Sequence, residues 1–148
     1  MKKFSHLDDR GRARMVDVGH KPPQLRIAVA EGSVRCAPKT IYALRAKKIP
    51  KGDVFTVAKI AAIQAAKRTD ELIPLCHSLP LDAVDIHFSL KKNHVHLRAE
   101  ARTTAKTGVE MEALAAVSVA ALTIYDMCKA VDKTMVIENV RLISKIKK

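Results

Sequence analysis

Apolar residues follow two different periods along the chain, and each period predicts a different kind of element. Within residues 82–102, apolar residues occupy alternate positions on both sides of Lys92-Asn93. Alternation is typical of half-buried strands, and a two-residue turn would place Leu90 opposite Val95, so that the apolar side chains of both strands share one face. This segment is therefore predicted to be a β-hairpin.

Two other segments are predicted to form long helices. Asp53 is a good N-cap for the first, which would run to about Arg68 and, because of its repeated Ala and Ile residues, be largely buried. The second is predicted over about residues 110–129. Its apolar run, residues 113–125, is shorter than the roughly 20 residues that cross a bilayer, so we interpret it as a core helix.

Further elements complete the pattern: a strand over residues 25–36, a short helix from Pro38 and a last strand over residues 135–146. The order strand, two helices, two strands, helix, strand predicts an α+β fold. It matches a ferredoxin-like sandwich, with an antiparallel sheet, helices packed on one face and an extra helix in the first crossover. No linker or internal repeat divides residues 1–148, so a single domain is expected, with residues 1–23 as a mobile N-terminal arm.

The basic composition favours an anionic partner. Lys and Arg number 27 against 15 for Asp and Glu, which gives a net charge of +12. A phosphorylated metabolite, nucleic acid and a membrane surface all satisfy this charge, although most of the basic residues are interpreted as solvated surface. Aromatic residues make up only 3% of the chain, which weakens a nucleic-acid interpretation because single strands are usually bound by stacking on aromatic rings. Nucleic-acid binding stays as the alternative function.

The cysteines and the N-terminus indicate a compartment. Three cysteines form no paired spacing, and the chain begins with charged residues where a secretory signal would need an apolar core. Both features are typical of a protein of the reducing cytoplasm. No membrane partner is expected.

Cys76 and His77 lie side by side between a predicted helix and a predicted strand, where a loop can present them to a pocket. Zinc would need more ligands at wider spacing, so no metal site is expected. A thiol nucleophile activated by His77 is disfavoured because neighbouring side chains of an extended segment point in opposite directions. His87, His94 and His96 fall on the polar face of the hairpin and are interpreted as solvated.

The long helix places ionisable residues at both of its ends. At 100° per residue, Glu112, Asp126 and Lys129 share one sector of its surface, yet Glu112 and Asp126 would be about 21 Å apart along the axis. One copy of the helix cannot bring both ends to one small substrate. Two copies packed antiparallel about a two-fold axis would do so, which predicts a site shared between subunits.

Several short segments, spread in order over nearly the whole chain, carry a resemblance to a known family. They are Met15-Val16-Asp17-Val18, Lys51-Gly52-Asp53, Ala65-Ala66-Lys67-Arg68-Thr69, Leu75-Cys76-His77, Gly108-Val109-Glu110-Met111-Glu112-Ala113-Leu114 and Tyr125-Asp126-Met127-Cys128-Lys129-Ala130. Together they resemble the MoaC family of molybdenum cofactor biosynthesis.

The resemblance implies a cytoplasmic protein with a ferredoxin-like fold, assembled as a hexamer of three dimers with sites at subunit interfaces. It also implies a lyase that converts 3′,8-cyclo-7,8-dihydroguanosine 5′-triphosphate, made by a separate upstream radical enzyme, to cyclic pyranopterin monophosphate and pyrophosphate. No electrons change hands in this reaction, so no cofactor is expected, and magnesium would enter only with the pyrophosphate.

By the same resemblance, Lys51, His77, Asp126 and Lys129 are expected to be catalytic. The substrate-binding residues are expected to be Asp17, Lys21, Arg26, Lys67, Leu75, Cys76, His77, Glu110, Met111 and Glu112. Lys51 lies just before a helix N-terminus, which favours phosphate, although both Lys51 and Lys67 also fit a plain surface role. About 24 Å of helix would separate these two lysines, which again points to a site built from two chains. Asp126 and Lys129 are predicted to handle protons as a pair, with the pKa of Lys129 lowered by a partly desolvated pocket, although a simple ion pair between them is the alternative.

Overall fold

The computed structural model describes residues 4–148, so the first three residues of the predicted N-terminal arm lie outside the described residues. The elements follow the order β1 (Gln24–Arg35), α1 (Pro38–Arg45), α2 (Val54–Lys67), α3 (Thr69–Leu72), β2 (Ala83–Leu90), β3 (His94–Ala105), α4 (Glu110–Cys128) and β4 (Val136–Lys147). Every element expected from the periodicity is present at nearly the expected bounds. The single turn α3 was not predicted.

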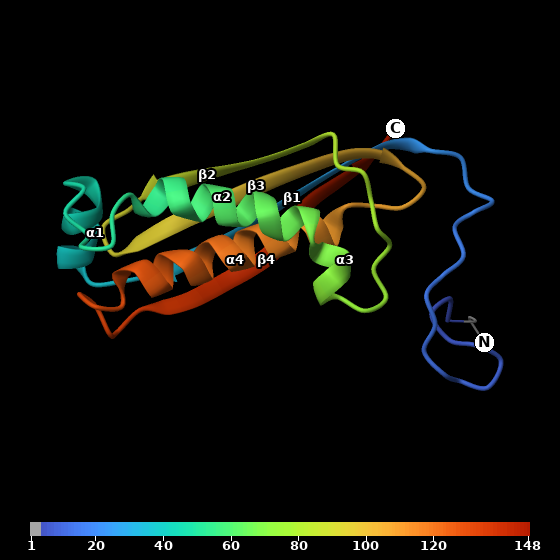
Figure 1. The fold of residues 1–148 in the computed structure, drawn as a ribbon, viewed down its shortest axis with the longest axis horizontal. Coiled ribbons are helices and arrows are strands. Elements are labelled where there is room, and N and C mark those ends of the chain that lie inside the picture. Colours follow the sequence, from blue (N-terminus) through green and yellow to red (C-terminus); the bar gives the residue numbers. More distant parts are fainter. Residues whose placement is uncertain (1–3) are drawn as a thin grey trace.

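The strands form one antiparallel sheet in the order β2-β3-β1-β4. Helices α2 and α4 lie side by side along one face of this sheet, and α1 lies at one end of it (Figure 1). Leu90 pairs with Val95 across the hairpin, as its apolar pattern requires. The prediction of an α+β, ferredoxin-like arrangement is confirmed.

Local chemistry sets the loop and helix start that follow α1. Lys47 and Gly52 adopt positive φ angles of 53° and 106°, which let the basic loop reverse direction. Asp53 then caps α2, because its Oδ1 accepts a hydrogen bond from the backbone N–H of Thr56 at 3.2 Å. Lys51 thus lies in a short loop that the turn at Lys47 and the cap at Asp53 hold at its two ends.

Helix α4 is the centre of the core. Four of its alanines, Ala113, Ala116, Ala120 and Ala121, are completely buried against the rest of the core, and Val117 and Ile124 are buried with them. Gly32 in β1 allows the close approach of α4, since a Cβ there would lie 2.8 Å from Val117 Cγ1. By length and composition alone α4 would also pass for a membrane-crossing helix, but half of its most apolar window is buried inside the fold. It is the core helix that the sequence predicts.

Helix α2 is buried on one side only, so the prediction that it would be largely buried is wrong. Ala58 and Ala62 are completely covered, whereas Val57 and Ile60 are 43% and 53% exposed. The reason is geometric: α4 and the sheet cover one face of α2, and its remaining apolar residues point away from both.

Candidate active site

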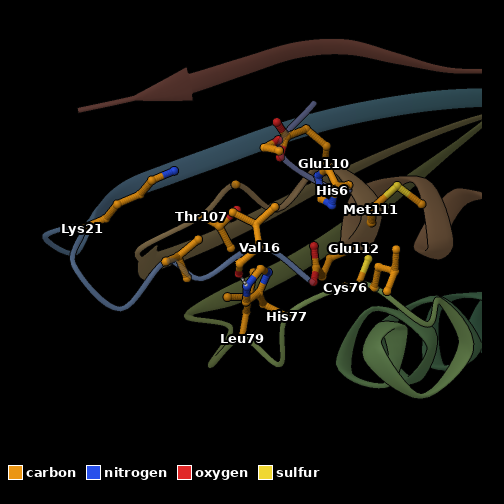
Figure 2. A pocket seen from close by; sticks show the side chains of 14 residues that line it. His6, Val16, Lys21, Cys76, His77, Leu79, Thr107, Glu110, Met111 and Glu112 are labelled. Carbon is orange, nitrogen blue, oxygen red and sulfur yellow. Dashed lines mark hydrogen bonds between the residues drawn. The ribbon is translucent and has the colours of Figure 1, made fainter. Parts of the chain in front are cut away.

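A cavity of about 340 Å³ opens at the N-terminal end of α4. Three segments that are distant in sequence line it: the N-terminal arm, the loop between α3 and β2, and the first turn of α4 (Figure 2). The expected site residues among its lining are Lys21, Leu75, Cys76, His77, Glu110, Met111 and Glu112. The structure thus brings together seven of the residues that the sequence singles out.

His77 joins the loop to the arm. Its Nε2 lies 2.6 Å from the carbonyl oxygen of Val16, and because a carbonyl can only accept, Nε2 carries the proton and donates. A second bond fixes the arm further along, from Lys106 Nζ to the carbonyl of Gly19 at 2.7 Å. These two bonds hold the N-terminal arm against the rest of the fold, and the first of them also fixes the ring of His77.

Glu112 is the buried acid of the cavity, with only 4% of its surface exposed. Burial raises the pKa of its carboxyl group, and the nearby acids Glu110 and Asp70 raise it further. Burial and the charge of Glu112 likewise raise the pKa of the Cys76 thiol. A raised pKa disfavours the thiolate form of Cys76.

A second charged group lies at the opposite end of α4. Asp126 Oδ1 pairs with Lys129 Nζ at 2.7 Å, and its Oδ2 pairs with Lys51 Nζ at 2.9 Å. Lys51 also donates to the backbone carbonyl of Asp126 at 3.1 Å. The loop between α1 and α2 thus brings Lys51, whose position before a helix favours phosphate, to the predicted acid–base pair of Asp126 and Lys129.

The charges of this lysine–aspartate cluster, Lys51, Asp126 and Lys129, stabilise one another. Hydrogen bonds from Lys129 and then Lys51 lower the pKa of Asp126 to about 2. Asp126 in turn raises the pKa of Lys129. The expected lowering of the Lys129 pKa is therefore wrong for the single chain, because this lysine is exposed and paired with a carboxylate instead of desolvated.

The remaining expected residues lie near the cavity or away from both groups. Asp17 is exposed between two cavity-lining residues, and its Oδ1 accepts from the backbone N–H of Gly19 at 2.8 Å. Lys67 is exposed at the last turn of α2 and does not line the cavity. Neither residue is brought to the lysine–aspartate cluster.

Arg26 lines a smaller neighbouring cavity of about 220 Å³, together with Glu110 and Lys145. Its buried Nε has no hydrogen-bond partner within the described residues, and its Nη2 makes only long contacts of 3.5 Å. Lys145 Nζ pairs with Glu110 Oε1 at 3.2 Å. Glu110 lines both cavities, and Arg26 and Lys145 place two cationic side chains beside it.

The sequence did not single out His6, which also lines the main cavity and lies near Glu110 and Met111 (Figure 2). A hydrogen-bonded turn holds it there. Asp8 Oδ1 accepts from the backbone N–H groups of Arg10 and Arg12, and Arg14 N donates to the carbonyl of His6 at 2.9 Å. The spacing of an Asp followed by Gly11 is a turn signal that would have predicted this local structure, though not its contact with the cavity.

No group of three or more His, Cys, Asp or Glu side chains within residues 4–148 is arranged to hold a metal ion. His87, expected to be solvated, is exposed, and its Nε2 lies 3.1 Å from Asp85 Oδ2. His96 is partly covered, because Nε2 contacts Glu31 Oε2 at 3.2 Å on the sheet face opposite the helices.

Comparison with known proteins gives matches over nearly the full length of the chain. Residues 15–147 match the model of the MoaC family. The chain is 55% identical over 147 residues to the cyclic pyranopterin monophosphate synthase of Pelotomaculum thermopropionicum, covering 98% of this chain and 86% of the relative. It is 57% identical to that of a Roseiflexus species, covering 98% and 93%. It is also 58% identical over 140 residues to a molybdenum cofactor biosynthesis bifunctional protein of Chlorobaculum tepidum, covering 95% of this chain and 45% of that longer protein. The chain belongs to the MoaC family.

Proposed function

We propose that this protein is a cyclic pyranopterin monophosphate synthase, an enzyme of molybdenum cofactor biosynthesis. The observation that carries the proposal is identity of about 55% over 98% of the chain to relatives of that name. The substrate is 3′,8-cyclo-7,8-dihydroguanosine 5′-triphosphate, and the products are cyclic pyranopterin monophosphate and pyrophosphate. An upstream radical enzyme supplies the substrate, and the reaction takes place in the cytoplasm.

The two charged groups suit the two tasks of this reaction. Rearrangement of the purine-derived ring requires proton transfers, for which Asp126, Lys129 and His77 are the proposed catalytic groups. The triphosphate needs cations, which Lys51, Lys21 and Arg26 supply. Glu112 enters the reaction with its carboxyl group biased toward the protonated form, so it is suited to donate a hydrogen bond or a proton.

The proposed site is shared between subunits. The helix rise puts Glu112 and Asp126 about 21 Å apart in one chain, and Figure 1 shows the ends of α4 at opposite ends of the fold. A two-fold partner would bring its lysine–aspartate cluster to the cavity of the first chain. Ile60 and Leu122, which are 53% and 57% exposed, supply the apolar surface that such a contact buries. Three such dimers would form the hexamer.

Magnesium is proposed to act only as the counter-ion of the triphosphate and pyrophosphate. Removing it with EDTA should therefore weaken substrate binding while leaving the fold and the oligomer unchanged. Thermal unfolding and light scattering with and without EDTA, beside an activity titration with Mg²⁺, test this. Dissociation or unfolding in EDTA would mean that a metal has a structural role.

The decisive experiment supplies the purified protein with enzymatically prepared cyclic dihydroguanosine triphosphate. We expect pterin product and pyrophosphate in equal amounts, with no reaction on guanosine triphosphate itself. Consumption of guanosine triphosphate without the upstream enzyme would overturn the substrate assignment. Tight binding of single-stranded nucleic acid, with no turnover of the cyclic substrate, would favour the alternative function.

A further inference from the structure

Asp132 is a buried carboxylate in the turn that follows α4, with 4% of its surface exposed. Four hydrogen bonds satisfy it. Oδ2 accepts from the backbone N–H of Ala37 at 2.8 Å and from Thr40 Oγ1 at 2.9 Å. Oδ1 accepts from the backbone N–H and the hydroxyl of Thr134 at 2.9 and 2.7 Å. None of these partners is a cation, so the charge is balanced by dipoles alone.

This arrangement requires that both oxygen positions of the Asp132 side chain accept hydrogen bonds. The N–H groups of Ala37 and Thr134 can only donate, and they face different oxygens of Asp132. An asparagine would turn its own NH₂ donors toward one of them. Burial by itself would raise the pKa of Asp132, but the bonds from Thr134, Ala37 and Thr40 outweigh burial and hold the pKa well below its usual range. Asp132 is therefore ionised whenever the protein is folded near neutral pH.

Asp132 joins the two segments that carry the lysine–aspartate cluster. On one side its backbone N–H donates to the carbonyl of Cys128 at 3.0 Å, which ties it to the last turn of α4 beside Asp126 and Lys129. On the other side it holds the start of α1, and the loop after α1 delivers Lys51 to Asp126. In Figure 1, α1 lies at the end of the sheet where α4 also ends. The clamp of Asp132 with Ala37, Thr40 and Thr134 is thus a fixed link between this helix and α4.

We propose that Asp132 is a positioning residue for the catalytic lysine–aspartate cluster: its carboxylate clamps α1 to the end of α4 and so holds Lys51 on Asp126. The effect of Asp132 on kcat rests on the proposed function, whereas the position of Lys51 on Asp126 can be measured without substrate. Asp132 does not touch the substrate and acts through Lys51.

The first test reads the geometry directly. Asp132→Asn should break the bonds of one carboxylate oxygen, either those from Ala37 and Thr40 or those from Thr134. Thr40→Val should remove one of the two bonds to α1 and leave the one from the Ala37 N–H. In both variants Lys51 should withdraw from Asp126, so the Asp126 pKa, about 2 in the unaltered protein, should rise. It should stay below the ordinary value, because Lys129 remains on the same helix. NMR titration of the Asp126 carboxyl carbon measures this.

A matched control separates positioning from general loss of stability. Thr69 is as buried as Thr40, but its hydroxyl bonds only to Ala65 and Ala66 at the far end of α2. Thr69→Val should therefore leave the Asp126 pKa unchanged. If Asp132→Asn does not fold, the Asp126 pKa measured in Thr40→Val tests the proposal instead. An unchanged Asp126 pKa in folded Thr40→Val would overturn the proposal.

The second test uses the reaction. A displacement of about 1 Å in a catalytic group can cost up to about a hundredfold in rate, so kcat of Asp132→Asn should fall by roughly tenfold to a hundredfold, with a smaller fall in Thr40→Val. Asp132→Glu, which keeps both acceptors on a longer stem, should recover part of the loss. Unchanged kcat in both folded variants would sink the positioning role. If the unaltered protein fails to turn over the cyclic substrate, the proposed function fails, while the NMR titration still decides the clamp.

Discussion

At the scale of single residues, the surroundings of each carboxyl group explain the direction of its pKa shift. Asp132 is buried and ionised because four donors surround it. Asp126 is exposed and ionised because two lysines flank it. Glu112 is buried, and only a bond from its own backbone N–H opposes the effect of burial, so the pKa of its carboxyl group is raised. The carboxyl groups of one chain thus differ in pKa because their surroundings differ.

The lowered pKa of Asp132 makes a prediction about stability against pH. A carboxyl group whose pKa is lower in the folded protein contributes stability that is present above the unfolded value, 3.8, and is lost as the pH falls below it. Asp132→Asn also leaves a buried donor unsatisfied, at about 1–3 kcal/mol, so at pH 7 its melting temperature should fall by several degrees. Thermal unfolding from pH 2.5 to 7 should show this difference shrinking in acid. A constant difference at all pH values would mean that packing, not charge, explains the loss.

Asp126 and Lys129 are predicted to act as a unit. Asp126→Asn and Lys129→Ala should each lower kcat by about 10²–10⁴-fold, since general acid–base groups contribute that much. The double variant should be little worse than either single one. Both residues are exposed, so melting temperature and oligomer size should hardly change. Near-normal turnover of Asp126→Asn would leave the pair as a surface ion pair and move the catalytic role to His77 or Glu112.

At the scale of elements, periodicity predicted what depends on local pattern and missed what depends on long-range contact. The hairpin register and the cap at Asp53 follow from residues close in sequence. The single turn α3 is too short to leave a periodic signal. The link from His77 to Val16 spans 61 positions, and no local rule places them together. The family resemblance supplied the cavity residues from Lys21 to Glu112, whereas no motif or local rule pointed to His6.

The N-terminal arm is predicted to bind substrate through His6. Its turn presents the imidazole to the cavity, near the residues proposed to bind the substrate. One hydrogen bond to a charged group contributes about 1.5–3 kcal/mol, so His6→Ala should weaken substrate binding by about tenfold or more while changing kcat less. Calorimetry and steady-state kinetics measure the two effects. His87→Ala is the control, since this histidine lies exposed on a strand outside the cavity. Equal behaviour of the two variants would exclude a role for the arm.

At the scale of the whole molecule, α4 holds the two groups apart. The helix runs through the core from Glu110 to Cys128, with Glu112 near one end and Asp126 near the other. Neither end alone has both the buried acid and the lysine–aspartate cluster. Cationic side chains lie at both ends, with Lys21 and Arg26 near the Glu112 end and Lys51 and Lys129 around Asp126. A dimer that joins the two ends would concentrate these cations around a triphosphate.

Subunit mixing tests this assembly quantitatively. In a two-fold dimer each site takes Glu112 from one chain and Asp126 from the other. When inactive Glu112→Ala and Asp126→Ala chains are dissociated, mixed in equal amounts and reassembled, half of the dimers are mixed, and one of the two sites in each is intact. Activity should return to about one quarter of the unaltered protein. Mixing Glu112→Ala with His77→Ala is the matched control: both residues line the same cavity, so no intact site can form and activity should stay absent. If mass spectrometry shows mixed dimers of the first pair but no activity returns, each site must be built within one chain, and the lysine–aspartate cluster would then need a role outside catalysis.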